Sequence, residues 1–183
     1  MKQKRTDVIW AAVCVMAISL TLNGRADNDL PLQAKQTIAD FQNADPGLKT
    51  FFDNAAGYAV FPDVGKGGFI VGGARGKGLL FEKGTITGQT TMTQASIGAQ
   101  AGGQSFAQII FFESPGAVSD FKSGKFELGA DVSAVAVSQG ASQSANYKKG
   151  VAVFTKPKSG LMVQASVGGQ KFKFEPLISP TGK

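Results

Sequence analysis

A glycine-rich stretch between Ala56 and Phe81 constrains the fold of this chain more than any other feature. It reads AGYAVFPDVGKGGFIVGGARGKGLLF, and seven of its glycines fall within the fourteen residues from 65 to 78. Glycine lacks a Cβ, so it permits sharp bends and close approach, but it weakens a strand without tertiary support. The stretch therefore predicts strongly bent strands with another chain segment or a ligand lying close against them.

Two helices are predicted before this stretch. A helical stripe of apolar residues is formed by Leu30, Ala34, Ile38 and Phe41. Asp45-Pro46 is typical of an N-cap followed by proline at the first helical position, which predicts a second short helix that stops before Gly57. We expect these helices to close one end of a β core. The alternative is an amphipathic element that contacts a membrane, but the polar face of 27–53 is weakly acidic.

From Tyr58 onward the apolar pattern changes to that of strands. The predicted strands are 58–61, 69–74, 77–82, 84–93, 96–101, 106–112, 131–138, 151–155, 161–167 and 171–174. Residues 109–112 are apolar on both faces, which favours the centre of a sheet. Ser114-Pro115 predicts a third short helix, and 139–146 is polar and predicted to be a long loop. The fold class expected is mainly β (α+β): a curved antiparallel sheet or partly closed barrel with two short N-terminal helices and one inserted helix.

The first 26 residues have the pattern of a secretory signal. A basic start precedes an apolar run from 8 to 22, and Gly24-Arg25-Ala26 places small residues at −3 and −1. We expect cleavage near Ala26, a single domain over 27–183, and a periplasmic or secreted location in the cell envelope. An uncleaved membrane anchor is the alternative, although the run is shorter than the roughly 20 residues that a spanning helix needs.

Cys14 is the only cysteine and lies inside that apolar run. It would be the lipidated first residue of a lipoprotein, but Val13 stands where such a site needs a small residue. If cleavage removes Cys14, the mature chain has no cysteine and forms no disulfide, although the expected compartment is oxidising. Packing must then supply its stability.

The charge is mild but unevenly distributed. The chain has 19 Lys and Arg against 13 Asp and Glu; cleavage at residue 26 removes four of the cations and one anion, which leaves a charge of +3. Residues 27–65 hold two cations against six anions, whereas 141–183 hold seven against one. A basic end favours an anionic partner. The alternative is that these are ordinary solvated lysines, which keep a β protein soluble.

The sequence offers little reactive chemistry. The absence of histidine, and of cysteine after residue 14, removes the usual nucleophile designs and most transition-metal sites. The acidic residues are scattered singly, without an EF-hand pattern. Gly76-Lys77 is followed by Gly78 where a P-loop requires Ser or Thr, and no nucleic-acid readout motif occurs. We therefore expect no enzyme, no cofactor, no metal and no nucleic-acid partner.

The glycine-rich stretch also carries a family resemblance. Its opening GYAVFP, the paired glycines after Lys66 and before Ala74, and Gly76 and Gly78 resemble the first signature of the SYLF domain. The likeness continues through 96–103, 128–130 and 159–161, and covers roughly residues 30 to 175. The SYLF domain is a lipid-binding module of secreted bacterial proteins and of eukaryotic proteins that act between phosphoinositides and actin. The resemblance implies affinity for anionic phospholipids, whereas the export signal makes actin an unexpected partner.

Basic residues beside the glycine turns and near the polar loop are the candidate binding site. Outward-pointing N–H groups of such turns can hold an anion, and a lysine or arginine adds full charge. The candidates are Lys66, Arg75, Lys77, Lys148, Lys149, Lys156 and Lys158. We expect an exported, non-catalytic protein that binds anionic phospholipid or a membrane surface through this β scaffold. The alternative is a structural or interaction protein of the cell envelope that holds a protein partner.

Overall fold

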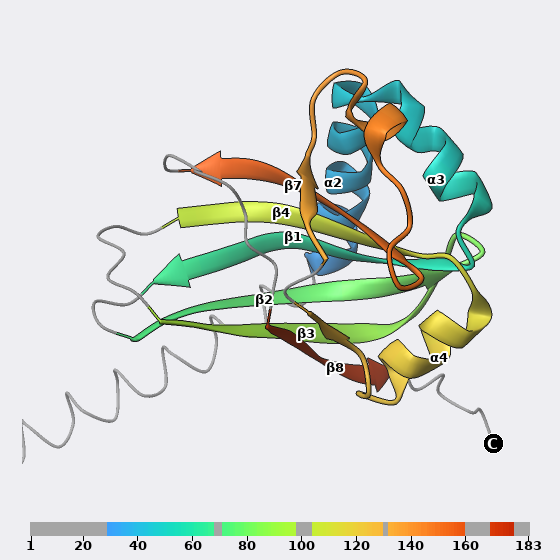
Figure 1. The fold of residues 1–183 in the computed structure, drawn as a ribbon. Coiled ribbons are helices and arrows are strands. Elements are labelled where there is room, and N and C mark those ends of the chain that lie inside the picture. Colours follow the sequence, from blue (N-terminus) through green and yellow to red (C-terminus); the bar gives the residue numbers. More distant parts are fainter. Residues whose placement is uncertain (1–28, 68–70, 98–103, 130–131, 160–168, 178–183) are drawn as a thin grey trace, which may run out of the picture.

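The structure is a computed structural model that describes residues 29–67, 71–97, 104–129, 132–159 and 169–177 (Figure 1). The expected signal segment with Cys14 and the strand expected over 161–167 lie outside these residues. The same holds for the glycine pair 102–103, whose position between the predicted strands 96–101 and 106–112 predicts a hairpin turn or bulge.

One sheet of eight strands forms the body of the described chain, in the order β5-β8-β3-β2-β1-β4-β7-β6. The strands are β1 Gly57–Gly67, β2 Val71–Glu82, β3 Thr85–Ile97, β4 Gln104–Phe112, β5 Glu127–Leu128, β6 Ala134–Ala136, β7 Val151–Ser159 and β8 Gln170–Pro176. Neighbouring strands are antiparallel except β6 and β7, which are parallel. The sheet curls into an open half-barrel, which confirms the predicted fold class.

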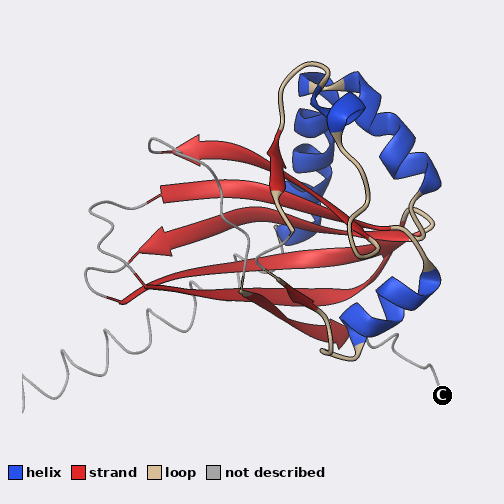
Figure 2. Ribbon diagram, viewed as in Figure 1, coloured by secondary structure: helices blue, strands red, loops and turns tan. Residues whose placement is uncertain are grey.

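Two helical elements, η1 and α4, begin at the capping residues that the sequence predicts. The helical elements are α2 Leu30–Ala44, η1 Pro46–Leu48, α3 Lys49–Asn54, α4 Pro115–Lys122 and η2 Ala141–Ser144, of which η1 and η2 are 3₁₀ helices. Gly47 N–H donates to Asp45 Oδ1 at 3.1 Å, and Ala117 N–H donates to Ser114 Oγ at 3.3 Å. Each cap satisfies a backbone donor that lacks a helical partner. Figure 2 shows α2 and α3 together over one part of the sheet and α4 separate from them.

The glycine-rich stretch forms longer strands than the sequence predicted. β1 continues past Pro62 because the pairing register shifts between Val60 and Asp63, and such an irregularity accommodates a residue without an N–H. The predicted break at Arg75-Gly76 is wrong. Gly76 pairs with Val64 of β1 and Met92 of β3, so both neighbouring strands support this glycine.

The glycines predicted that a chain segment or a ligand lies close against them, and in the structure it is a segment of the chain itself. A Cβ at Gly78 would lie 2.6 Å from the Phe61 ring and 2.5 Å from the carbonyl oxygen of Val60. A Cβ at Gly76 would lie 2.8 Å from Val64. Gly65 is different, because a Cβ there would meet nothing within 4 Å. Residues of β1 therefore pack against the β2 glycines, while Gly65 faces open space.

Each face of the sheet carries its own hydrophobic core. The first core includes Phe61, Met92, Phe106, Phe112, Phe121 and Phe172, and it receives residues from α4 and β5. The second core packs under α2 and includes Leu30, Phe41, Leu79, Ile109, Phe111 and Phe154. The rings of Phe61 and Phe172, from strands that are not neighbours, lie 5.8 Å apart in the first core. This contact places the first core on the concave side of the curl.

A buried glutamine cluster also joins distant strands on the concave side. Gln108 of β4 and Gln170 of β8 exchange two side-chain hydrogen bonds, of 2.8 and 3.1 Å, and neither side chain is exposed. Gln170 Nε2 also donates to Gln94 of β3 at 3.4 Å. Since three strands separate β4 from β8, these bonds tie the two sides of the half-barrel together.

We expect the Gln170→Leu variant to lose about 1–3 kcal/mol of unfolding free energy, because it leaves the buried Gln108 amide without its partner. The double variant Gln108→Leu/Gln170→Leu is expected to recover most of that loss, since both polar groups are removed together. Urea unfolding of the two single variants and the double variant measures the coupling. Simply additive losses would show that the pair does not act as a unit.

The segment expected to be a long polar loop is attached to the N-terminal helices. Ser142 N–H, in η2, donates to Asp45 Oδ2 at 2.6 Å, and both residues are buried. Burial by itself would raise the pKa of Asp45, but hydrogen bonds from Ser142, Gly47 and Gly140 lower it below its usual value. Asp45 is therefore ionised at neutral pH, and it holds the α2–α3 corner against the loop.

Candidate functional site

The helices cover only part of one sheet face, and the remainder is exposed and basic. The ribbon shows the strands extending well beyond α2 and α3 (Figure 1). On β2, Arg75 and Lys77 are exposed while the intervening Gly76 is buried; on β8, Lys171 and Lys173 alternate in the same way with Phe172. We call the exposed part of this face the basic face. It carries Arg75, Lys77, Lys156, Lys158, Lys171 and Lys173.

Strand pairing aligns four of these cations in two rows. In one row Arg75 pairs with Thr93, and Thr93 pairs with Lys171. In the next row Lys77 pairs with Thr91, and Thr91 pairs with Lys173. Neighbouring strands lie about 4.8 Å apart and alternate residues about 7 Å apart, so the four Cα atoms outline a rectangle of about 7 by 10 Å.

A shallow depression of about 390 Å³ lies over this rectangle. Its lining includes three of the cations, Arg75, Lys171 and Lys173. The other lining residues are Thr91, Thr93, Phe172 and Glu175. Three cations and two hydroxyl groups around one hollow form a site suited to an anion.

The β7 side of the basic face contributes two further lysines. Lys156 Nζ donates to the backbone oxygen of Asp40 in α2 at 3.3 Å, so this lysine borders the helix layer. Lys158 forms an exposed ion pair of 3.5 Å with Asp63 of β1. Exposed pairs of this kind contribute about 0–1 kcal/mol, so Lys158 can exchange its partner at little cost.

Three carboxylates partly neutralise the positive charge of the basic face. Asp63 pairs with Lys158, Glu127 pairs with Lys171 at 3.2 Å, and Glu175 pairs with Lys173 at 2.7 Å. Six cations against these three anions leave a net charge of +3 on the described part of the face. The hydrogen bond and charge of Lys173, with the charge of Lys77, lower the pKa of Glu175, so it remains ionised.

The structure brings together four of the seven predicted site residues: Arg75, Lys77, Lys156 and Lys158. Lys148 and Lys149 lie before the first residue of β7, at the end opposite to Lys156 and Lys158. The six residues from Val151 to Lys156 alone span about 17 Å. Lys66 pairs through its backbone with Ala74 and Gln104, but its side chain lies outside the described part of the structure.

Sequence reasoning missed Lys171 and Lys173 as site residues. In the sequence these lysines alternate with Phe172 and Phe174, which indicates a strand with one solvent-exposed and one buried face. That pattern does not say which strand lies beside it. Only the pairing of β8 with β3 brings the two lysines opposite Arg75 and Lys77.

The described residues lack two features, a cluster of metal-binding side chains and a membrane-spanning helix. No three metal-binding side chains among them come together. No helix among them is long and apolar enough to span a bilayer.

The fold defines a class of β-rich domains: a half-barrel that presents a basic face beside a layer of short helices. Residues 93–176 match the family model described as "Ysc84: Las17-binding protein actin regulator". The chain is also 30% identical over 144 residues to the Beta cell expansion factor A of Aeromonas veronii. These findings confirm the resemblance seen in the sequence: the chain contains a segment similar to the SYLF (Ysc84) domain family, which is associated with lipid-related or actin-related binding.

The two comparisons cover different parts of the chain. The aligned region includes 77% of this chain but only 54% of the Aeromonas protein, so the chain spans about half the length of that relative. The family model begins at Thr93 and ends at Pro176. It therefore includes the β7 and β8 lysines of the basic face, while Arg75 and Lys77 lie before the matched segment.

Proposed function

We propose that this protein binds anionic phospholipid membranes through the basic face, as an exported protein that performs no catalysis. The observation that carries the proposal is the gathering of six cations, from β2, β7 and β8, on one exposed sheet face. The similarity to a family associated with lipid-related binding supports the same ligand class.

The energetics of the proposal require several cations to act together. A lysine or arginine near an anionic membrane surface contributes about 1 kcal/mol, and its attraction falls off within a Debye length of about 8 Å at physiological salt. The net charge of +3 on the basic face thus corresponds to about 3 kcal/mol, or more than a hundredfold in affinity. Arg75, Lys77, Lys171 and Lys173 outline a rectangle of about 7 by 10 Å across β2, β3 and β8, so these four cations can approach the lipid surface together.

Export and location in the cell envelope are part of the proposal. The pattern of the first 26 residues supports it: a basic start, an apolar run, and small residues before Asp27. The absence of histidine, and of cysteine after residue 14, from the sequence supports a binding role without catalysis. N-terminal sequencing of the protein recovered from the cell envelope checks cleavage near Ala26.

A second candidate function is the binding of a protein partner by the same face. The description of the matched family, a Las17-binding protein and actin regulator, favours this candidate. A protein partner would have to present an acidic surface to the cations. Protein-free vesicles separate the candidates, since only lipid binding is visible in that assay.

The test is co-sedimentation with vesicles of phosphatidylcholine alone or mixed with phosphatidylglycerol. We expect binding to the anionic vesicles only, with a steep decrease as salt rises. The variant Arg75→Gln/Lys77→Gln is expected to bind about 30-fold more weakly, because two contributions of about 1 kcal/mol are lost.

The matched control is Lys148→Gln/Lys149→Gln, which removes the same charge at the opposite end of β7. We expect it to change vesicle affinity less than threefold, since these residues lie outside the basic face. An equal loss of vesicle affinity in both double variants would show that affinity depends on the total charge of the protein and not on the position of the cations. Binding that ignores lipid charge would reject the membrane proposal altogether.

A further inference from the structure

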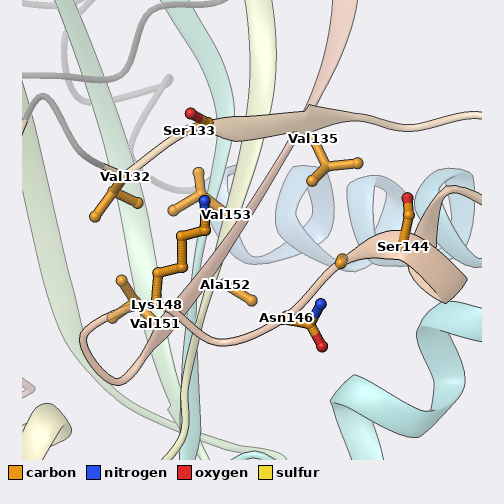
Figure 3. A pocket seen from close by; sticks show the side chains of 10 residues that line it. Val132, Ser133, Val135, Ser144, Asn146, Lys148, Val151, Ala152 and Val153 are labelled. Atoms are coloured by element: carbon orange, nitrogen blue, oxygen red, sulfur yellow. The ribbon is translucent and has the colours of Figure 1, made fainter.

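A second, smaller cavity lies away from the basic face, between β6, β7 and the segment that follows η2 (Figure 3). Its volume is about 120 Å³. The apolar part of its wall includes Val132, Val135, Ala152 and Val153. Polar groups at its margin include Ser133 and Lys148.

A turn holds the backbone of Lys148 at this cavity, and the Lys148 side chain is exposed. Its backbone N–H donates to Val151 O at 2.8 Å, and Val151 N–H donates to Lys148 O at 3.1 Å, which closes a tight turn. Figure 3 shows the side chain of Lys148 extending from this turn along the cavity toward Ser133. Within the part of the chain that the structure describes, no carboxylate forms an ion pair with its ammonium.

The combination of one cation with an apolar wall selects the chemistry of a ligand. A charged amine attracts an anion, while the valine side chains favour an alkyl group over water. An apolar protein cavity of about 150 Å³ holds a molecule as large as benzene, so about 120 Å³ admits a short aliphatic chain. A long acyl chain or a sugar would not fit into this volume.

We propose that this cavity is a binding site for a short, unbranched aliphatic monocarboxylate of about four to six carbons. The carboxylate pairs with the Lys148 ammonium and accepts a hydrogen bond from the Ser133 hydroxyl group. The alkyl chain lies against Val135, Ala152 and Val153. This site does not depend on the membrane function, because none of these residues belongs to the basic face.

The test is a titration of the isotopically labelled protein with sodium hexanoate, without vesicles, followed by NMR. We expect saturable shifts of the backbone amides of Ser133, Val135 and Ala152 at millimolar concentrations. Hexan-1-ol, which has the same chain without the charge, is expected to bind at least fivefold more weakly. Hexylamine is expected not to bind, because its charge repels Lys148.

Three variants identify the residues involved. Lys148→Met keeps the aliphatic stem and is expected to weaken hexanoate binding at least fivefold, while the adjacent Lys149→Met leaves it unchanged. Val135→Phe fills the cavity and is expected to abolish the shifts. Retained melting temperatures show that Lys148→Met and Lys149→Met are folded.

The proposal is overturned by any of three results. The first is that hexanoate shifts no residue of the cavity. The second is that hexan-1-ol binds as tightly as hexanoate. The third is that Lys148→Met and Lys149→Met bind hexanoate equally well. Each of these leaves the vesicle result untouched, so a failure here is distinct from a failure of the membrane proposal.

Discussion

Replacing Gly78 by alanine is expected to lower the unfolding free energy by about 2–3 kcal/mol. The new methyl group would lie 2.5 Å from the carbonyl oxygen of Val60 and 2.6 Å from the Phe61 ring. The oxygen belongs to the backbone of the neighbouring strand, so it cannot move without disturbing the β1–β2 pairing. In a domain of this size the loss corresponds to a decrease of about 5–10 °C in melting temperature.

The same substitution at Gly65 provides the matched control. A Cβ at Gly65 meets nothing within 4 Å, and alanine is intrinsically better than glycine in a strand by about 0.5–1 kcal/mol. We therefore expect Gly65→Ala to be neutral or slightly stabilising in thermal and urea unfolding. Equal destabilisation at both positions would mean that these glycines serve backbone flexibility and not close packing.

Replacing Asp45 by alanine is expected to cost about 3 kcal/mol of unfolding free energy, because two backbone N–H groups lose a charged acceptor. Gly47 N–H and Ser142 N–H donate to this buried carboxylate at 3.1 and 2.6 Å. The bond to Ser142 joins residues 97 positions apart in the chain, so its loss also frees the loop from the helices. Hydrogen exchange should increase around η2 and η1, while the central strands stay protected.

The contribution of Asp45 depends on pH in a defined direction. The pKa of Asp45 in the folded chain lies below the usual aspartate value of 3.8, so the folded chain holds this proton less tightly than the unfolded chain. The stabilisation is therefore complete above about pH 4–5 and decreases as the pH falls through 3.8 toward the lower folded value. Asp45→Asn has no ionisable group at this position and therefore lacks this pH-dependent stabilisation. The stability difference between wild type and Asp45→Asn should shrink as the pH falls from 5 to 2. A difference that stays constant would show that the charge of Asp45 does not stabilise the fold.

The helices were predictable because their signals are local. Asp45 and Ser114 cap helices through contacts with residues two or three positions away, and such contacts do not depend on the rest of the fold. The strands of the glycine-rich stretch were less predictable. The sequence predicts a strand end at Gly76 because glycine has a low intrinsic preference for strands. Pairing with β1 on one side and β3 on the other overrides that preference.

The candidate site was predicted in part for a similar reason. Arg75 and Lys77 were recognised as cations beside predicted glycine turns. The predicted turn is wrong, because both residues lie inside β2, which pairs with β1 and β3 at these positions. Their relation to Lys171 and Lys173 depends on the pairing of β2 with β3 and of β3 with β8. Lys148 and Lys149 were grouped with Lys156 and Lys158 by sequence distance, but an extended strand separates residues that are close in sequence.

The amino-acid sequence by itself determined the family resemblance, the β-rich class, the starts of two helical elements and the kinds of charge available for binding. These properties follow from residue types and short spacings, which act over one or two turns of chain. The tertiary structure alone decided which lysines share a face, at which glycines a neighbouring side chain occupies the space of a Cβ, and where a cavity remains. Those outcomes depend on strand order and register, because pairing joins residues that are far apart in the sequence.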